Sequence, residues 1–186
     1  MAVLSARIAN TRLKFALPHI KGDVLDIGCQ RGQLYEYAGD QMTSYTGIDL
    51  NQSVLEQGRK AHPECQFHEV NIDTAPLEFS AAFDSIVMLA VIEHVFNLNT
   101  LGHSIAKALK PGGSVILTTP TPFGNDIIHA MGARIGLFSK DAADDHIAIF
   151  NKKRLEIFAA EFDLTMTTYK QFQLGCNQLA ILTKSH

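Results

Sequence analysis

Apolar and polar positions follow two alternating patterns along this chain. Short apolar or alternating runs predict strands, and helical spacing of apolar residues predicts helices between them. Five strands are expected at about Asp23–Ile27, Ser44–Asp49, Gln66–Asn71, Phe83–Leu89 and Ser114–Thr118. Helices are expected at about Leu4–Phe15, Gln33–Ala38, from a cap at Asn51 or Ser53 to about His62, and at Leu98–Leu109. Because strands and helices alternate, we expect an α/β fold with a parallel, doubly wound sheet.

The end of the chain closes this sheet differently. From Asn151 a capped helix places apolar residues on one face, and two strands follow at about Leu164–Tyr169 and Gln178–Thr183. These strands are close enough in sequence to pair antiparallel. The predicted fold is a Rossmann-like sheet of about seven strands, mostly parallel with an antiparallel last strand, and with helices on both faces. One domain is expected over residues 1–186, with an N-terminal helix in 1–20 and a less regular segment at 119–148.

Composition and charge exclude several classes of function. The chain has 186 residues, 46% of them hydrophobic and 19% charged, which is ordinary for one globular domain. The formal net charge is −3 and there is no basic block, which argues against nucleic acid as a partner. Cys29, Cys65 and Cys176 share no metal-ligand spacing, so we expect no metal site and free thiols in a reducing cytosol. The amino terminus lacks a signal-peptide core and no apolar run is long enough to span a membrane, so a cytoplasmic location is predicted. The sequence gives no indication of oligomeric state.

The stretch Val24–Gly32 carries the strongest chemical signal. An apolar strand that contains one acid, Asp26, ends in two glycines, Gly28 and Gly32, four residues apart. In an open α/β sheet such a turn lies at the carboxyl edge of the strand, where ligands bind. The second strand ends in Asp49, whose carboxylate can accept both hydroxyls of a ribose. The pattern therefore predicts a ligand of the adenosine type.

Two features argue against a dinucleotide as this ligand. The third and sixth positions of a G-x-G-x-x-G turn are here Gln30 and Gln33 rather than glycines. A buried carboxylate at Asp26 would repel a pyrophosphate, whereas an ammonium group would benefit from it. Asp26 and Asp49 together favour an adenosine ligand with a positively charged tail. A nicotinamide-dependent oxidoreductase stays open as a less favoured alternative.

Four motifs together resemble the class I S-adenosylmethionine-dependent methyltransferases. They are Val24–Gly32, Gly47-Ile48-Asp49-Leu50, Phe83-Asp84 through Glu93-His94, and Leu109-Lys110-Pro111-Gly112-Gly113, in the family's order and spacing over roughly residues 20–120. The resemblance is greatest to the small-molecule branch that includes the ubiquinone-biosynthesis O-methyltransferases. It implies S-adenosyl-L-methionine as cofactor, S-adenosyl-L-homocysteine as product, and a small-molecule oxygen or nitrogen as methyl acceptor.

The resemblance also implies roles for residues along the cofactor. Asp26, Gly28 and Gly32 would shape the pocket for its methionine part, with Cys29 in the same turn as a small buried hydrophobe rather than a nucleophile. Asp49 would hold the ribose hydroxyls. The other cofactor-binding residues that it implies are Leu50 against the adenine, Asn71 and Ile72 near the adenine amino group, and Met88 and Leu89 near the sulfonium.

The pattern departs from the family at two of these positions. Gln30 replaces the usual second glycine, and Asn71 replaces an aspartate, so both could weaken or retune cofactor binding. They are the only support for a non-catalytic binding or regulatory module of the same fold, which stays open beside the enzyme. The enzyme, a methyltransferase acting on a small molecule, is the favoured prediction.

Two histidines are candidate catalytic residues. His94 follows Glu93 just past the expected cofactor site, where a histidine could act as general base on an acceptor hydroxyl or only make local hydrogen bonds. His146, in Asp144-Asp145-His146, stands where relatives often carry a histidine that faces the active site, and a solvated acidic loop is the alternative. The segment 119–148 is expected to shape the acceptor pocket.

Overall fold

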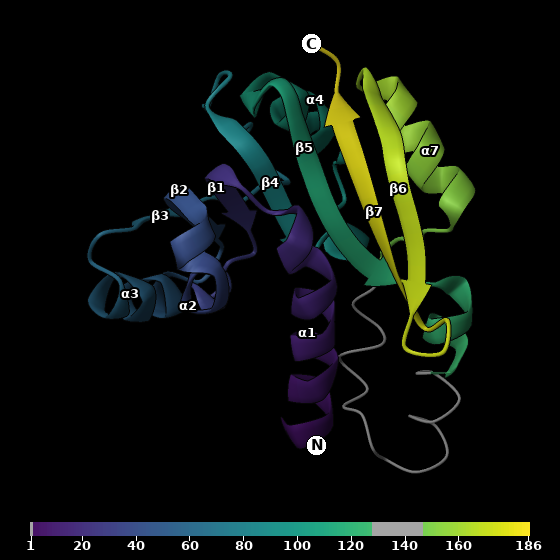
Figure 1. The fold of residues 1–186 in the computed structure, drawn as a ribbon, viewed down its shortest axis with the longest axis horizontal. Coiled ribbons are helices and arrows are strands. Elements are labelled where there is room, and N and C mark those ends of the chain that lie inside the picture. Colours follow the sequence, from purple (N-terminus) through teal and green to yellow (C-terminus); the bar gives the residue numbers. More distant parts are fainter. Residues whose placement is uncertain (1, 128–146) are drawn as a thin grey trace.

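The computed structural model describes residues 2–127 and 147–186, and side chains from Arg7 onward within these ranges. A seven-stranded sheet with the order β3-β2-β1-β4-β5-β7-β6 forms the centre of the molecule (Figure 1). Its strands are β1 Gly22–Ile27, β2 Met42–Asp49, β3 Gln66–Glu69, β4 Phe83–Leu89, β5 Leu109–Pro120, β6 Leu164–Phe172 and β7 Asn177–Lys184. The main described helices are α1 Ala2–Ala16, α2 Gln33–Ala38, α3 Gln52–Ala61, α4 Leu98–Ala108 and α7 Lys152–Glu161, and residues 122–127 are also helical.

The direction of the strands confirms the predicted Rossmann-like topology. Strands β1 to β5 pair only in parallel with one another, and β7 runs antiparallel to both of its neighbours, β5 and β6. The strand order reverses between β1 and β4, which places the ends of these two strands at a topological switch point. Ligands of doubly wound sheets bind at such a point, beyond the carboxyl ends of the strands.

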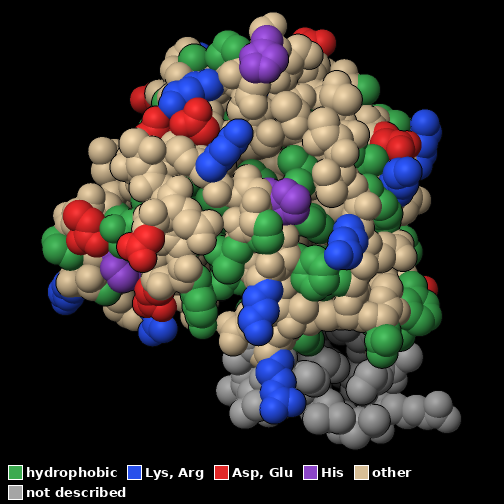
Figure 2. Space-filling view, viewed as in Figure 1, with side chains coloured by type: hydrophobic (Ala, Val, Ile, Leu, Met, Phe, Trp, Pro, Cys, Tyr) green, Lys and Arg blue, Asp and Glu red, His purple; other side chains and the backbone are tan. Residues whose placement is uncertain are grey.

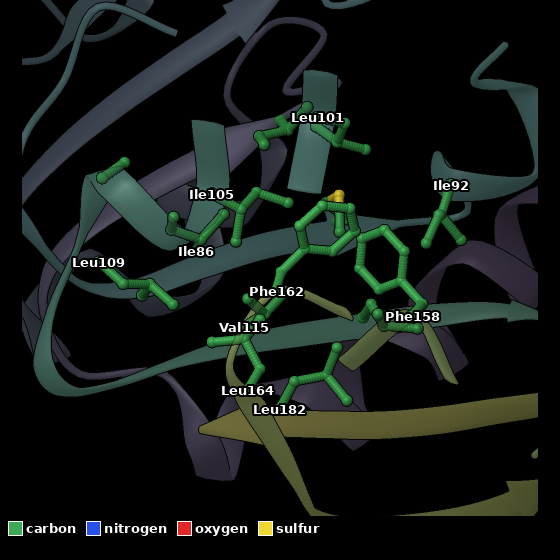
Figure 3. Packing of buried hydrophobic residues seen from close by; sticks show 14 of the residues in the cluster. Ile86, Ile92, Leu101, Ile105, Leu109, Val115, Phe158, Phe162, Leu164 and Leu182 are labelled. Atoms are coloured by element: carbon green, nitrogen blue, oxygen red, sulfur yellow. The ribbon is translucent and has the colours of Figure 1, made fainter. Parts of the chain in front are cut away.

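Helices cover both faces of the sheet, as the sequence predicts. On one face α4 and α7 pack against the strands through a cluster that includes Leu101, Ile105, Phe158 and Phe162 (Figure 3). On the other face α1, α2 and α3 contribute Leu13, Ala16, Leu34 and Leu55 to a second cluster. Because both faces are buried, the central strands carry apolar runs, which are Val24–Leu25 in β1, Ile86–Leu89 in β4 and Val115–Leu117 in β5.

Asparagine side chains begin three of the helices. Asn51 accepts hydrogen bonds from the main-chain amides of Ser53 and Val54 at the start of α3. Asn97 and Asn151 cap α4 and α7 in the same manner. An asparagine oxygen satisfies amides that have no partner within the helix, so these helices start where the sequence indicates.

The sequence reading was wrong about where β5 begins. Residues 110–113 were expected to form a turn before a strand at Ser114, but β5 starts at Leu109 and includes them as an irregularity opposite Asp84. There Lys110 Nζ contacts Asp23 Oδ2 at 2.6 Å and Asp84 Oδ2 at 2.8 Å. This lysine therefore joins β1, β4 and β5 at the amino end of the sheet. Smaller differences are an earlier start of β2, at Met42, and an earlier end of β3, at Glu69.

Helix α1 is held against the C-terminal part of the sheet. The ring of Phe15 stacks on Phe172 with centroids 4.4 Å apart, and Lys170 Nζ lies 4.9 Å from the centre of the Phe15 ring. One turn earlier, Arg12 Nε donates to Asn177 Oδ1 at 2.9 Å. Side chains from α1, β6 and β7 thus meet near the carboxyl end of β5 (Figure 1).

The surface view shows how charges and hollows are distributed on this face. Figure 2 shows Lys and Arg side chains beside acidic ones at the edges of this face and, along α1, Lys and Arg side chains without acidic neighbours, and the outline is indented between α1 and the part formed by α2 and α3. Within the described residues, no helix is both long and apolar enough to cross a membrane. Most of the segment 119–148, with Asp144 and His146, lies outside the described residues.

Candidate active site

The turn after β1 takes a backbone conformation that glycine favours. Gly28, Gln30 and Gly32 have φ of +76°, +51° and +90°, all in the left-handed region. The amides of Gly28 and Cys29 both donate to the carbonyl of Ile48. A Cβ atom at position 28 would lie 2.6 Å from Val91 Cγ2, so a side chain there would close the gap between this turn and the loop after β4. Gly28 thereby leaves space at the switch point.

Asp49 and the turn are joined by a hydrogen bond. Its Oδ2 accepts from the main-chain amide of Gln30 at 2.9 Å, and its Oδ1 accepts from the amide of Asn51 at 2.9 Å. The contribution of residue 30 is therefore its main-chain amide, which any residue supplies. A residue other than glycine at position 30 therefore keeps this hydrogen bond. Its only disadvantage is the conformational energy of a non-glycine residue in the left-handed region.

Asp26 lies directly below the turn and is almost completely buried. It is 5% exposed, and its Oδ2 accepts a hydrogen bond of 2.7 Å from the hydroxyl of Tyr45 on β2. Burial raises the pKa of Asp26 to about 7, while the hydrogen bond from Tyr45 lowers it and the negative charge of Asp49 raises it. A carboxyl with this pKa gains from a cationic ligand group at neutral pH.

A cavity of about 180 Å³ opens between the ends of β1 and β2 and the loop after β4. Most of its lining is apolar, with three polar side chains among it, which is the usual composition of a small-molecule site. The lining residues are Ile27, Gly28, Ile48, Asp49, Leu50, Val70, Ile72, Asp73, Val91, His94 and Val95. Five residues singled out from the sequence are thus brought together here: Gly28, Asp49, Leu50, Ile72 and His94.

Asp73 is a polar lining residue that the sequence reading did not identify. Its Oδ1 accepts from the amides of Phe96 and Asn97 at 2.8 and 2.9 Å, which ties the loop after β4 to the loop after β3. Asn71, expected in this region, instead accepts a hydrogen bond from the amide of Asp73 at 3.0 Å and stabilises the local turn. An Asn side chain that accepts a hydrogen bond from the amide two residues later is a known turn pattern. This pattern in the sequence could have indicated that Asn71 serves the turn and that Asp73 is the better candidate for the site.

The remaining predicted cofactor residues lie beside the cavity rather than in its lining. Met88 is fully buried in the core shared with α4 and α7, and Leu89 packs against the opposite cluster. Gly32 begins α2, and Asp26 lies beneath the turn. Cys29 is buried, and burial together with the charges of Asp26 and Asp49 raises the pKa of its thiol. It is held as a protonated, inert thiol.

The Glu93-His94 pair sends its two side chains into different environments. His94 is exposed and lines the cavity. Glu93 is 1% exposed, and neither of its carboxyl oxygens has a hydrogen-bond partner. Burial raises the pKa of Glu93, and the nearby charges of Arg12 and His94 lower it. The sequence drew attention to the pair through its histidine, but the structure makes the glutamate the more unusual group.

Comparisons with known proteins agree with this geometry. A family model described as "Methyltransferase domain" matches residues 4–169. A ubiquinone biosynthesis O-methyltransferase of Idiomarina loihiensis is 34% identical over 125 residues, covering 61% of this chain and 50% of the relative. One of Alkalilimnicola ehrlichii is 27% identical over 154 residues, covering 79% and 62%. The chain spans about half the length of the curated relatives that it matches.

Solved structures share the fold over nearly the whole chain. An S-adenosylmethionine-dependent methyltransferase of Mesorhizobium loti has a TM-score of 0.74 at 15% identity, covering 95% of this chain and 98% of that one. A putative enzyme of the same kind from Listeria monocytogenes has a TM-score of 0.72 at 15% identity, covering 97% and 100%. With the family match, these findings confirm the predicted resemblance to class I S-adenosylmethionine-dependent methyltransferases, and the chain belongs to the methyltransferase-domain family.

Proposed function

We propose that this protein transfers a methyl group from S-adenosylmethionine to a small-molecule acceptor. The observation that carries the proposal is the position of Asp49, which lines an apolar cavity at the switch point and is fixed by the glycine-containing turn. A carboxylate held in this way binds the two hydroxyls of a ribose. The adjoining buried Asp26 suits a positively charged tail and disfavours a pyrophosphate.

The residues present fit this cofactor along its whole length. Asp49 would hold the ribose, and the apolar side chains of Leu50, Val70 and Ile72 would contact the adenine. Asp73 would accept a hydrogen bond from the adenine amino group, in place of the predicted Asn71. At the other end, the space left by Gly28 and the charge of Asp26 would receive the amino-acid part.

Bound S-adenosylmethionine supplies an activated methyl group on a sulfonium. The protein then mainly has to hold the acceptor in line with that methyl group and exclude water, and positioning of this kind can lower a barrier by ~7–11 kcal/mol. His94 lines the cavity and is proposed as the group that receives the acceptor's proton. His146 stays a proposed catalytic residue without a structural argument.

The proposed acceptor is an oxygen of a small molecule. The curated relatives named above are O-methyltransferases of ubiquinone biosynthesis, and a phenolic hydroxyl is an acceptor that needs little activation by a base. The net charge of −3 gives no support for a nucleic-acid acceptor.

Calorimetric titration with S-adenosylhomocysteine tests the proposal. We expect binding to the wild-type chain and at least tenfold weaker binding to Asp49→Ala, because the ribose loses its acceptor. Asp40→Ala, at an exposed acid outside the cavity, serves as control and should bind like wild type. Absence of binding to the wild type, or equal binding by Asp49→Ala, would overturn the proposal. A thermal-shift comparison with NADH separates the nicotinamide alternative, and a mass-spectrometric screen for methyl transfer separates a non-catalytic module.

A further inference from the structure

The buried carboxyl group of Glu93 has no explanation within the cofactor site. It is not among the lining residues of the cavity, and both of its oxygens are buried without a hydrogen-bond partner. A buried carboxylate without partners is costly, and native structures keep such a group only where something else satisfies it. The Glu93 side chain therefore indicates a ligand group or ordered water that completes its hydrogen bonds.

The main chain holds Glu93 in a fixed position. Its carbonyl accepts hydrogen bonds from the amides of Ile147 and Ala148 at 2.9 and 3.1 Å. Strand β4 ends at Leu89. Directly after it, the amide of Ala90 donates a hydrogen bond to the carbonyl of Thr118 on β5, which anchors the start of the same loop. The carboxyl group is thus presented by a loop bound at both ends rather than by a flexible segment.

A second unpartnered group lies beside this carboxyl. The hydroxyl of Thr119, near the end of β5, is buried and has no hydrogen-bond partner. It contacts Glu93 closely enough to lower the pKa of that carboxyl, but the contact does not have the geometry of a full hydrogen bond. A small hydroxylated group could form hydrogen bonds with both the carboxyl of Glu93 and the hydroxyl of Thr119.

Arg12 supplies the opposite charge. Its Nε donates a hydrogen bond to Asn177 Oδ1 at 2.9 Å. The side-chain amide of Asn177 donates in turn to Gln173 Oε1 at 2.6 Å. The positive charge of Arg12 favours the ionised form of Glu93, and the negative charge of Glu93 favours the ionised form of Arg12. Since arginine stays protonated in proteins, the pair carries no net charge when Glu93 is ionised.

We infer that Glu93 and Thr119 form a polar subsite for a neutral hydrogen-bond donor of the methyl acceptor, and that Arg12 is a positioning residue that acts through Glu93. This inference rests on the proposed function, since it places the acceptor beside the cofactor cavity. A cation is a poor occupant, because the guanidinium of Arg12 already balances the carboxylate and would repel a second positive charge. A hydroxyl fits, since it can donate to Glu93 and accept from Thr119.

The state of Glu93 is measured directly by carbon NMR of the full chain labelled at the glutamate carboxyl carbons. The resonance is assigned with Glu93→Gln. Arg12→Met is expected to move the Glu93 titration midpoint up by about one pH unit or more. Arg12→Lys, which keeps the charge, should restore most of the shift, and Lys14→Met, at an exposed lysine of the same helix, should change nothing. An unchanged midpoint in Arg12→Met would overturn the role of Arg12.

The subsite is tested with two matched probes on the chain saturated with S-adenosylhomocysteine. Catechol offers hydroxyl donors, and 1,2-dimethoxybenzene has the same ring without them. We expect catechol alone to shift the Glu93 resonance, and Thr119→Val to reduce that shift. If neither probe, or both equally, moves the resonance, Glu93 binds only water and the subsite is disproved. Binding of S-adenosylhomocysteine within twofold of wild type in Arg12→Met shows that such a failure concerns the subsite, whereas loss of binding by the wild type would concern the proposed function.

Discussion

Tyr45 on β2 donates a hydrogen bond of 2.7 Å to Asp26 on β1, inside the sheet and directly below the ligand-binding turn. The two residues belong to neighbouring parallel strands and are both buried. The hydroxyl stabilises the ionised form of Asp26, and burial together with the negative charge of Asp26 raises the pKa of Tyr45 well above its ordinary value. The charge of Asp26, which we propose serves the cofactor's amino-acid part, therefore depends on a residue that does not line the cavity.

Replacing Tyr45 with Phe should make cofactor binding more sensitive to pH. Loss of the donor raises the pKa of Asp26 above about 7, so more of the protein carries a neutral Asp26 at pH 7. A hydrogen bond to a charged group contributes about 1.5–3 kcal/mol, which corresponds to roughly one pH unit or more. Calorimetric titration with S-adenosylhomocysteine at pH 6, 7 and 8 should show the rise in affinity displaced to higher pH. Tyr37→Phe, at an exposed tyrosine, is the control and should leave the profile in place.

Asp26 should also make the folded protein less stable as the pH rises. Its pKa is about 7 in the folded chain and about 3.9 in an unfolded one. Between these values the folded state holds a proton that the unfolded state has released, so stability falls from about pH 4 to about pH 7. The loss is on the order of 4 kcal/mol. Urea unfolding of wild type and Asp26→Asn across this range should give a flatter profile for the variant, and parallel profiles would contradict the prediction.

Lys110 should contribute stability in the opposite pH direction. Its hydrogen bonds lower the pKa values of Asp23 and Asp84, so their contribution is full above the unfolded value of about 3.9 and is lost as the pH falls through the lowered folded values. Lys110→Met leaves two neighbouring carboxylates uncompensated. Because all three side chains are about one-third exposed, solvent screens the interaction, and only a small loss in unfolding free energy at pH 7 is expected. Lys107→Met, at an exposed lysine on α4, should cost less than half as much.

Two substitutions in the turn after β1 should have different effects on stability, because one adds a side chain and the other removes one. Gly32 has φ of +90° and a Cβ there would lie 3.0 Å from Phe67 Cζ, so Gly32→Ala should cost ~1–2 kcal/mol or more. Gln30 already occupies the left-handed region with φ of +51°, so Gln30→Gly should not destabilise the chain and should bind S-adenosylhomocysteine like wild type. Thermal unfolding with and without S-adenosylhomocysteine distinguishes the two effects. A large loss of binding in Gln30→Gly would show that the Gln30 side chain itself is needed.

Asp73 is expected to serve cofactor binding in two ways, by holding the loop after β4 and by contacting the adenine. Two substitutions at this position distinguish them. Asp73→Ala removes the acceptor for the amides of Phe96 and Asn97 and the group proposed to bind the adenine, and should weaken S-adenosylhomocysteine binding at least tenfold. Asp73→Asn keeps an oxygen for those amides and should bind more tightly than Asp73→Ala. Asn71→Ala, which removes only the local turn contact at Asp73, should have the smallest effect. Equal binding by all three variants would exclude Asp73 from the site.

The sequence predicted most of the fold because both faces of the sheet are covered. Buried strands such as β4 must be apolar throughout, and asparagine caps such as Asn51 mark the first turn of a helix, so both leave local signals. The start of β5 was missed because glycines and a proline at positions 111–113 are normally turn residues. Only the pairing of Leu109 with Phe83 shows that the strand has already begun, and that contact is not local.

The site was predicted where one strand end carries both backbone and side-chain function, as at Gly28 and Asp49. It was missed where a residue acts through a distant partner. Nothing near Asp26 in the sequence indicates Tyr45, and nothing near Glu93 indicates Arg12, which is 81 positions away. Charge relations of this kind are set by the packing of β1 on β2 and of α1 on β7, so they become visible only in three dimensions.

The contact between Arg12 and Asn177 implies an order of assembly. The proposed cofactor residues from Asp26 to Asp73 belong to β1, β2 and the loops that follow β1, β2 and β3, whereas Arg12 and Asn177 are separated by 165 positions. During synthesis the strands of the first half emerge long before β7, and closing so large a loop is slow compared with local pairing. The contact that fixes Arg12 must therefore wait for the last strand, and with it the charge that Arg12 brings to Glu93.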